Sequence, residues 1–255
     1  MRIATWNVNS VRARLPRVLD WLGQHQPEVV CLQETKCRDE EFPAEAIEDL
    51  GYNIERWGQK TYNGVAILSK SPLEDVVKGF PDDEPDAEAR VLAATAGDVR
   101  ILNLYVVNGK EVGDPKYDKK LAWLDRLSAY VHAEFDMTDK VVLTGDFNIT
   151  FDDRDIYDPK RWHEKILCST PEREALAKIM EPGLTDAFRT FEEEGGHYTW
   201  WDFRTRGFGR DHGLRIDHFL MSPSALAACT GVTVDKEERG QEKPSDHAPV
   251  VATLE

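Results

Sequence analysis

Short apolar runs alternate along the chain with longer segments whose apolar residues recur at helical spacing. The short runs predict strands at residues 2–8, 29–32, 64–69, 91–95, 99–107, 141–144, 214–222 and 248–254. The helical spacing predicts helices at residues 15–22, 116–135 and 171–180. These are more strands than one simple doubly wound sheet contains. The pattern therefore predicts an α/β protein, a four-layered sandwich of two mixed β-sheets packed face to face and flanked by helices.

Length and composition narrow the class of protein. The chain has 255 residues, of which 41% are hydrophobic and 31% charged, an ordinary globular composition. No repeat or linker divides it, so we expect a single domain over residues 1–255. No run approaches about 18 consecutive apolar residues, so we expect no membrane-spanning helix and no membrane partner. A polar N-terminus and four cysteines without zinc-finger spacing predict a reduced, cytoplasmic protein, nucleoid-associated if it is bacterial.

Polar residues stand at the ends of the predicted strands. They are Asn7 and Asn9, Glu34, Tyr105 and Asn108, Asp146 and Asn148, Asp217, and Asp246 with His247. Strand ends are where an α/β protein gathers side chains from distant parts of its sequence. The placement of these residues predicts one convergent polar site.

Each of these residues also has a simpler explanation. Asn7 and Asn148 suit turns, Asp146 would be an ordinary strand exit, and His247 would lie in a surface loop. Asp217 interrupts a strand and is either exposed to solvent or buried with a partner. All of these explanations would have to hold independently, and for that reason we favour the common site.

Seven short motifs in a fixed order carry a resemblance that spans nearly the whole chain. They are Trp6-Asn7-Val8-Asn9, Leu32-Gln33-Glu34-Thr35-Lys36, Asn63-Gly64-Val65-Ala66, Leu104-Tyr105-Val106-Val107-Asn108-Gly109, Gly145-Asp146-Phe147-Asn148, Gly213-Leu214-Arg215-Ile216-Asp217 and Ser245-Asp246-His247. With these motifs the sequence resembles exonuclease III and the apurinic/apyrimidinic (AP) endonucleases of the endonuclease/exonuclease/phosphatase superfamily. The fifth and seventh motifs mark only the superfamily, whereas the second and sixth are narrower and indicate its DNA-repair branch.

The resemblance implies a DNA-repair nuclease that depends on Mg²⁺ or Mn²⁺. It would cut double-stranded DNA 5′ to abasic sites and degrade duplex ends from 3′ to 5′, acting as a monomer. Carboxylate and amide oxygens without thiolates also favour these hard cations over zinc. Two alternatives remain open: a phosphatase or phosphodiesterase of the same superfamily that acts on a small substrate, and a non-catalytic nucleic-acid-binding regulator.

The resemblance implies a role for each polar residue. The expected metal ligands are Glu34 first, then Asn7, Asp246, Asp146 and Asn148. Asp146 would also orient and deprotonate the attacking water. Asn148 would hydrogen-bond the scissile phosphate, and Tyr105 would contact that phosphate or the leaving oxygen. Asp217 would raise the pKa of His247 so that the imidazolium binds a phosphate oxygen, and either Asp146 or His247 is the general base.

A second group of residues is expected to contact DNA. In the family, the aromatics and leucine that match Trp200, Trp201 and Leu214 line a small apolar pocket for a flipped-out abasic sugar. Asn9 and Asn108 are expected to contact the DNA as well. Trp201 is bulkier than the Phe common there, and Asn9 replaces an Asp found in some relatives. These departures leave open the balance between exonuclease and abasic-site cleavage.

The net charge of −15, taken alone, opposes a nucleic-acid substrate, but its distribution removes the objection. Residues 39–49 hold six acids and no base, residues 74–90 seven acids and two bases, and residues 192–194 three acids. In contrast, Arg204, Arg206, Arg210 and Arg215 against Asp211 give +3 over residues 203–216, between the Trp pair and Asp217. Further bases flank the first two motifs, at Arg12, Arg14, Lys36 and Arg38. We therefore expect a basic DNA-facing rim with the acidic stretches held away from it.

Overall fold

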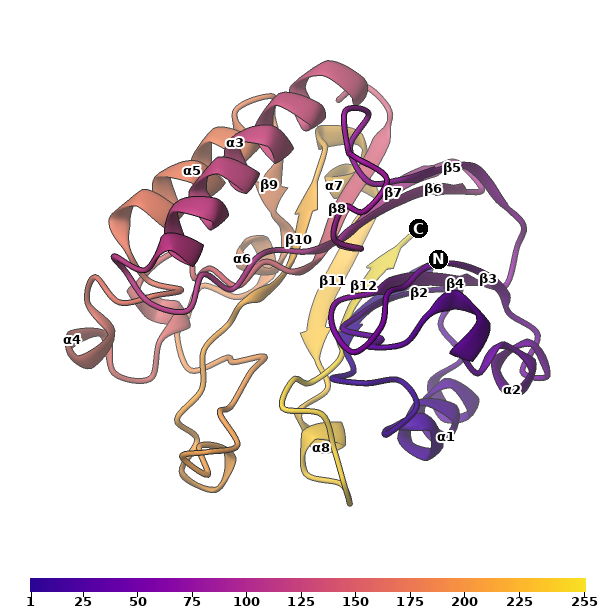
Figure 1. Ribbon diagram of the computed structural model, residues 1–255, viewed down its shortest axis with the longest axis horizontal. Helices are drawn as coiled ribbons and strands as arrows, with labels where there is room; N and C mark the ends of the chain where they lie inside the picture. Colours follow the sequence, from indigo (N-terminus) through magenta and orange to yellow (C-terminus); the bar gives the residue numbers. More distant parts are fainter.

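Two six-stranded sheets pack face to face in the computed structural model, which describes residues 1–255 (Figure 1). The first sheet has the order β11 (Cys229–Val234), β12 (Val250–Leu254), β1 (Arg2–Asn7), β2 (Val29–Gln33), β4 (Val65–Ser69) and β3 (Asn53–Trp57). The second has the order β5 (Leu73–Lys78), β6 (Val91–Ala96), β7 (Val99–Tyr105), β8 (Lys140–Asp146), β10 (Asp217–Met221) and β9 (Thr185–Asp186). Both sheets contain parallel and antiparallel pairs.

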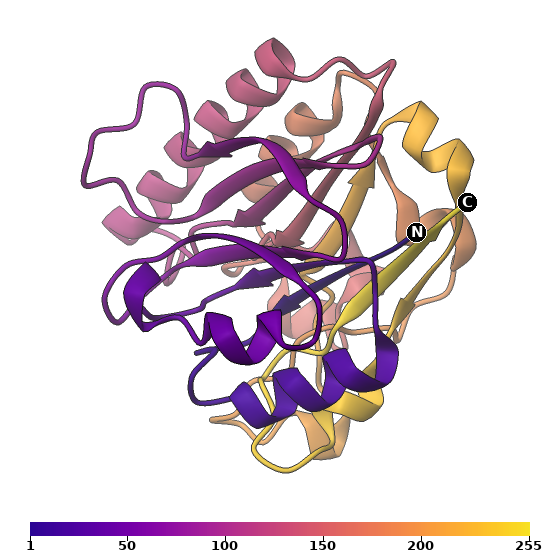
Figure 2. The same cartoon turned by 90° about the vertical axis from the view of Figure 1, so that its right-hand side faces the viewer.

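Helices form the two outer layers, as the turned view of Figure 2 shows. α1 (Leu15–His25) and α2 (Ala44–Glu48) cover the first sheet, and α3 (Pro115–Glu134) and α5 (Thr170–Met180) cover the second. The shorter helices are α4 (Pro159–Trp162), α6 (Ala187–Phe191), α7 (Pro223–Ala228) and α8 (Lys236–Arg239), with 3-10 turns at Asp39–Glu41, Asp153–Asp155 and Phe208–Arg210. None of the helices has both the length and the apolar character that a membrane crossing requires. The predicted four-layered α/β sandwich is confirmed.

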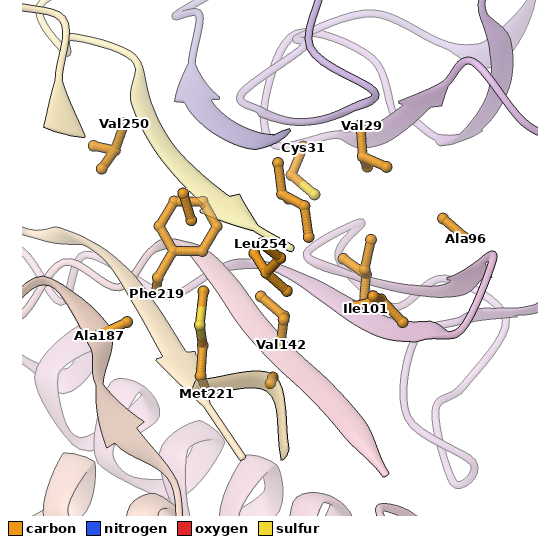
Figure 3. Packing of buried hydrophobic residues seen from close by; sticks show 14 of the residues in the cluster. Val29, Cys31, Ala96, Ile101, Val142, Ala187, Phe219, Met221, Val250 and Leu254 are labelled. Carbon is orange, nitrogen blue, oxygen red and sulfur yellow. The ribbon is translucent and has the colours of Figure 1, made fainter. Parts of the chain in front are cut away.

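Each interface between layers has its own apolar cluster. Between the sheets, Val29 of β2 faces Ile101 of β7 and Val142 of β8 (Figure 3). The outer face of the first sheet buries Val18 of α1, and that of the second buries Leu124 of α3. The central strands are therefore buried on both faces, and this explains why the sequence shows them as continuous apolar runs.

All eight predicted strands are present, with ends that differ by a few residues. The largest difference is at 214–222, where the strand begins only at Asp217. Leu214 instead forms isolated bridges with Trp200 and Ile156, in the loops beside the sheet. The apolar alternation of this segment continues into those loops because Leu214 is buried there as well.

The sequence pattern missed four strands, β3, β5, β9 and β11, and all four are edge strands. An edge strand has a neighbour on one side only, and its outward residues meet water. In β5, for example, only Leu73 and Val76 are partly buried and the other residues are exposed. Such a strand shows no continuous apolar run.

Candidate active site

Strand direction brings the polar residues to one edge of the sandwich. β1 runs parallel to β2 and β7 runs parallel to β8, so Asn7, Tyr105 and Asp146 stand at strand ends that reach the same edge. β10 is antiparallel to β8, and its first residue, Asp217, pairs with Asp146. β12 is antiparallel to β1, and the segment before it carries His247 to this edge.

A pocket of about 400 Å³ opens at this edge. Residues from six separate parts of the chain line it: Glu34, Tyr105, Asn108, Asp146, Asn148, Trp162, Ile166, Leu167, Trp200, Asp202, Arg204, Asp246 and His247. The structure thus brings together most of the residues that the sequence placed in one site. The simpler explanations, that each polar residue serves a separate turn or loop, are wrong.

Asn7 lies between the two carboxylates at the base of the pocket. Its Nδ2 donates to Glu34 Oε1 at 2.9 Å and to Asp146 Oδ2 at 2.9 Å, and its Oδ1 accepts from the backbone of Asn9. Asn7 is fully buried, so these bonds fix the separation of the two carboxylates. In this orientation Asn7 acts as a donor and holds the acidic residues in place.

Asn9 connects the second pair of charged groups. Its Nδ2 donates to Asp246 Oδ1 at 2.9 Å, and its Oδ1 accepts from Lys36 Nζ at 2.6 Å. Lys36 Nζ also lies 2.6 Å from Glu34 Oε2. An ammonium therefore faces Glu34 and neutralises part of the negative charge in this corner of the site.

Asn148 and Asn108 extend the site along the opposite wall. The backbone N–H of Asn148 donates to Asp146 Oδ1 at 2.9 Å, and its Nδ2 donates to Val106 O at 3.0 Å. Asn108 Nδ2 donates to Asn148 Oδ1 at 2.9 Å. One hydrogen of each side-chain amide remains available to a phosphate oxygen.

Asp217 and His247 form the predicted carboxylate–imidazole pair. His247 Nδ1 lies 2.9 Å from Asp217 Oδ2, and Nε2 lies 3.7 Å from Asp146 Oδ2. Burial alone would lower the pKa of His247, but the facing carboxylates of Asp217 and Asp146 outweigh burial and raise it to about 10. His247 is therefore an imidazolium at neutral pH. Asp217 is buried with a partner, which decides between the two alternatives left by the sequence.

Three of the four acidic residues that line the pocket, Glu34, Asp146 and Asp246, differ in their affinity for protons. Burial raises the pKa of Asp146 to about 7, against the opposing effect of the His247 imidazolium. Burial acts in the same sense on Glu34 and Asp246, but Lys36 lowers the pKa of Glu34 and His247 lowers that of Asp246. Of these three carboxylates, Asp146 is the one that can take up a proton near neutral pH.

Tyr105 stands half-buried at the end of β7, with the Arg90 guanidinium 4.7 Å from its ring centre. Burial and the nearby charges of Glu34 and Asp146 raise the pKa of its phenol well above 10. The hydroxyl therefore keeps its proton and can act as a hydrogen-bond donor.

The donor set of the pocket fits a hard divalent cation. Glu34, Asp146 and Asp246 offer carboxylate oxygens to a space into which Lys36 already places a positive charge. Asp146, Asp217 and His247 also lie close enough to share an ion. That second arrangement requires a neutral imidazole, whereas His247 is protonated and bonded to Asp217. An ion held by the carboxylate of Glu34 would meet no such requirement.

The aromatic wall differs from the expected one. Trp200 lines the pocket, and its Nε1 donates to Asp246 Oδ2 at 3.1 Å. Trp201 and Leu214 are fully buried behind it, and Trp201 Nε1 donates to Asp211 at 3.0 Å. Trp201 and Leu214 therefore do not line the pocket. Successive residues such as Trp200 and Trp201 point to opposite sides of an extended segment.

The apolar part of the pocket lining was not predicted from the sequence, apart from Trp200. Trp162 at the end of α4, together with Ile166 and Leu167, supplies the apolar lining there. Leu167 has φ = 72°, a left-handed conformation that is uncommon for leucine and can mark a functional constraint. This irregular segment shows no periodic pattern in the sequence. Its only local signal for burial is the pair of bulky apolar residues, Ile166 and Leu167, before Cys168.

Three of the four arginines of the predicted basic segment lie in the loop after Trp201. The fourth, Arg215, is buried and paired with Asp155 and Asp186, so its place in the rim was predicted wrongly. Arg204 lines the pocket, and Arg206 and Arg210 are exposed, with no carboxylate within salt-bridge distance. Around the first motifs, in contrast, Arg12 pairs with Glu41 and Arg38 pairs with Glu40. The arginine loop, which we define as residues 202–210, therefore carries three arginines without a paired carboxylate, one of which lines the pocket.

Comparison with known proteins assigns the family. Residues 4–247 match the model of the endonuclease/exonuclease/phosphatase family. The chain belongs to this family. It is similar to exodeoxyribonuclease III of Haemophilus influenzae, with 35% identity over 99% of both chains. Among solved structures, it is similar to the 3′ phosphatase NExo from Neisseria bound to a product DNA hairpin, with a TM-score of 0.96, 47% identity and coverage of 100% of this chain and 99% of that one.

An AP endonuclease from Archaeoglobus fulgidus gives the same TM-score of 0.96 with 35% identity, covering 100% of this chain and 99% of that one. The resemblance to exonuclease III and the AP endonucleases is therefore confirmed, and with it the prediction of a metal-dependent phosphodiesterase of the family's DNA-repair branch. The role of each individual residue remains a prediction.

Proposed function

We propose that this DNA-repair nuclease binds Mg²⁺ or Mn²⁺ beside Glu34 and hydrolyses the phosphodiester 5′ to abasic sites, and that it also removes nucleotides from 3′ ends. The observation that carries the proposal is the arrangement of Asp146. This buried carboxylate, held by Asn7 and by the backbone of Asn148, has a pKa near 7 and faces the His247 imidazolium across 3.7 Å. A proton acceptor and a positive phosphate ligand are thus fixed side by side.

The chain's own residues divide the chemistry between them. Asp146 orients the attacking water and accepts its proton, and the His247 imidazolium and the free amide hydrogen of Asn148 bind phosphate oxygens. The Tyr105 hydroxyl donates to the leaving 3′ oxygen. A cation bound by Glu34 and its neighbours would neutralise charge on the phosphate and lower the pKa of a bound water. We propose that the protein acts as a monomer, because one chain supplies every residue of the pocket.

A second activity, removal of a phosphate from a DNA 3′ end, is favoured by the similarity to the Neisseria 3′ phosphatase. Cleavage 5′ to an abasic site, exonucleolytic cleavage and 3′-phosphate removal all break the bond between phosphorus and a 3′ oxygen. The same acceptor and phosphate ligands therefore serve each reaction. The bulky side chains of Trp162, Ile166 and Leu167 limit which groups fit on the sugar side of the pocket. They therefore determine which of the three reactions the protein favours.

One assay separates these functions. The protein is incubated with labelled duplexes that carry a tetrahydrofuran abasic analogue, a 3′-phosphate at a nick or an undamaged 3′ end, with Mg²⁺ and with EDTA. We expect EDTA-sensitive hydrolysis of the abasic duplex and of the 3′ ends. Hydrolysis of inositol phosphate but of no duplex would instead support a small-molecule phosphatase, and DNA binding without hydrolysis would support a regulator.

A further inference from the structure

A fully buried ion pair lies directly behind the pocket and takes no part in the chemistry described above. It joins Lys120 of α3 to Glu172 of α5, and neither side chain is exposed at all. Lys120 Nζ also donates to Asn148 O at 2.7 Å and to Asn108 O at 3.2 Å. A lysine ammonium has three hydrogens, and here each has an acceptor.

Glu172 holds the opposite wall in a similar way. Its Oε1 accepts from the backbone N–H of Leu167 at 3.1 Å, and its Oε2 accepts from the backbone of Ser169 at 3.1 Å and from its hydroxyl at 2.6 Å. The left-handed Leu167 is thus anchored at its N–H. Its carbonyl oxygen accepts in turn from the backbone of Thr150 at 2.8 Å.

The ion pair therefore connects three segments that have no regular hydrogen-bonded structure of their own. They follow β7, follow β8 and precede α5, and they carry Asn108, Asn148 and Leu167 into the pocket. Gly109 permits the close approach: it has φ = 87°, and a Cβ there would lie 3.0 Å from the Lys120 stem and 2.9 Å from Ile166.

A buried ion pair seldom stabilises a folded protein more than an apolar pair of equal volume would, because removing two charges from water costs free energy. An apolar pair, however, could not fix the carbonyl oxygens and amides of three loops. The arrangement is better explained by the geometry that it imposes on the pocket than by the stability that it adds.

We propose that Lys120 and Glu172 are positioning residues, which hold the backbone of Asn108, Asn148 and Leu167 so that the two amide side chains face the scissile phosphate across from the apolar wall. This inference rests on the proposed function. Asn148 is expected to act on the phosphate in the transition state, so loss of the pair should lower kcat more than it raises KM.

The test is a double-mutant cycle between Lys120 and Asn148. We expect Lys120→Met to lower kcat by about 10- to 100-fold in the wild-type background and by less than about 3-fold in the Asn148→Ala background, because the amide that Lys120 positions is then absent. The cycle uses whichever duplex the wild type hydrolyses with Mg²⁺. Equal losses in both backgrounds, or an unchanged kcat, would overturn the proposal.

Unpaired Glu172 can destabilise the single variant, so Lys120→Met/Glu172→Gln is measured alongside it. The glutamine amide carries no charge, but its single oxygen cannot replace both carboxylate oxygens, which accept from Leu167 and from Ser169. A matched control is Arg17→Met, which breaks the Arg17–Glu238 pair between α1 and α8 and should leave kcat unchanged. A purely structural role predicts that kcat of the double variant recovers along with its thermal stability, whereas a positioning role predicts that stability recovers and kcat does not.

Hydrogen exchange provides a readout that does not need activity. Exchange of the Leu167 and Thr150 amides should accelerate by about tenfold or more in Lys120→Met/Glu172→Gln, while amides in the centres of β7 and β8 remain protected. Unchanged exchange at Leu167 and Thr150 would overturn the proposed anchoring. An inactive wild type with accelerated exchange in the variant would remove the proposed function and leave the anchoring intact.

Discussion

The surroundings of each carboxylate in the pocket determine its affinity for a proton. Asp146 and Glu34 are both carboxylates bonded to the same Asn7 amide, yet Lys36 lies beside Glu34 only. Asp146 is also the more deeply buried of the two. One carboxylate therefore remains ionised to hold a cation, and the other can exchange a proton near neutral pH.

Replacing Asp146 tests this division directly. Asp146→Asn should lower kcat by about 10²- to 10⁴-fold, because an amide cannot accept the proton of the attacking water. DNA affinity, measured by fluorescence anisotropy, should persist or increase slightly, since the change removes a negative charge near the phosphate. The same exchange at the exposed Asp20 of α1 should affect neither quantity. Near-wild-type turnover would remove Asp146 from the mechanism.

Asp217 should control the alkaline side of the pH profile. A histidine is protonated below its pKa, and the pKa of His247 is held at about 10 in part by Asp217. Asp217→Asn should lower that pKa, so activity should begin to fall at a lower pH than in the wild type. We expect about a tenfold deficit at pH 8.5 that shrinks toward pH 6.5, in kcat measured across this range. A deficit that is constant with pH would show that the charge of His247 is not used.

At the scale of the residue, the sequence predicted the polar half of the site and missed the apolar half. Asp146 and His247 stand out because charged groups beside strands require an explanation. Ile166 and Leu167 do not, because apolar residues are expected to be buried anywhere. Alternation along the segment places Trp200 and Trp201 on opposite sides, but which of them faces the pocket depends on the bridge between Trp200 and Leu214, a contact that no local pattern reports.

At the scale of the element, β10 carries the site on one face and a charged network on the other. Asp217 points to His247, and the next residue, His218, points to the outer layer. There Arg215 donates to both Asp155 and Asp186, and its Nη1 lies 3.2 Å from His218 Nδ1. His218 Nε2 donates to Ile149 O at 2.7 Å and ties the segment after β8 to β10.

This network makes stability depend on pH. Burial, together with the Arg215 guanidinium, lowers the pKa of His218 from 6.5 to about 4. The unfolded chain therefore takes up the proton first, and the contribution of neutral His218 is complete above pH 6.5 and lost as the pH falls to 4. The loss should reach up to about 3 kcal/mol in the free energy of unfolding, measured with urea.

His218→Gln provides the control for this loss. The amide can still donate to Ile149 and accept from Arg215, and it has no proton to gain in this range. The variant should therefore show a flatter decline between pH 6.5 and 4 than the wild type. Parallel declines would assign the acid sensitivity to other groups.

Elements in the centre of the sheets were predictable, and elements at the edges were not. The run at 141–144 reads as a strand because both faces of β8 are buried, whereas β11 leaves Thr230 and Thr233 exposed and reads as polar. The irregular loops that carry Asn108 and Leu167 are held by Lys120 and Glu172, and the ion pair that joins these loops links residues 52 positions apart in the chain. Local sequence cannot specify such a shape.

At the scale of the whole molecule, the acidic excess is partly neutralised away from the pocket. Asp82 and Asp83 pair with Arg126 of α3, and Glu88 pairs with Lys119 of the same helix. These acids therefore contact the outer helical layer. The acids near residue 40 instead pair with Arg12 and Arg38 and remove those two bases from the expected rim. The expected rim therefore loses these two bases, whereas the three arginines of the arginine loop have no paired carboxylate.

The positive charge of the arginine loop should determine how steeply DNA affinity falls with salt concentration. Each phosphate neutralised by the protein contributes about −0.9 to the slope of log affinity against log salt concentration. Arg204→Ala/Arg206→Ala should therefore make the slope less steep by about 1.8 and lower DNA affinity by about tenfold or more near 100 mM salt. Arg126→Ala/Lys178→Ala removes the same charge from the outer helices and should leave the slope unchanged. Equal slopes for the two double variants would mean that the whole charge of the molecule, and not the arginine loop, sets its attraction to DNA.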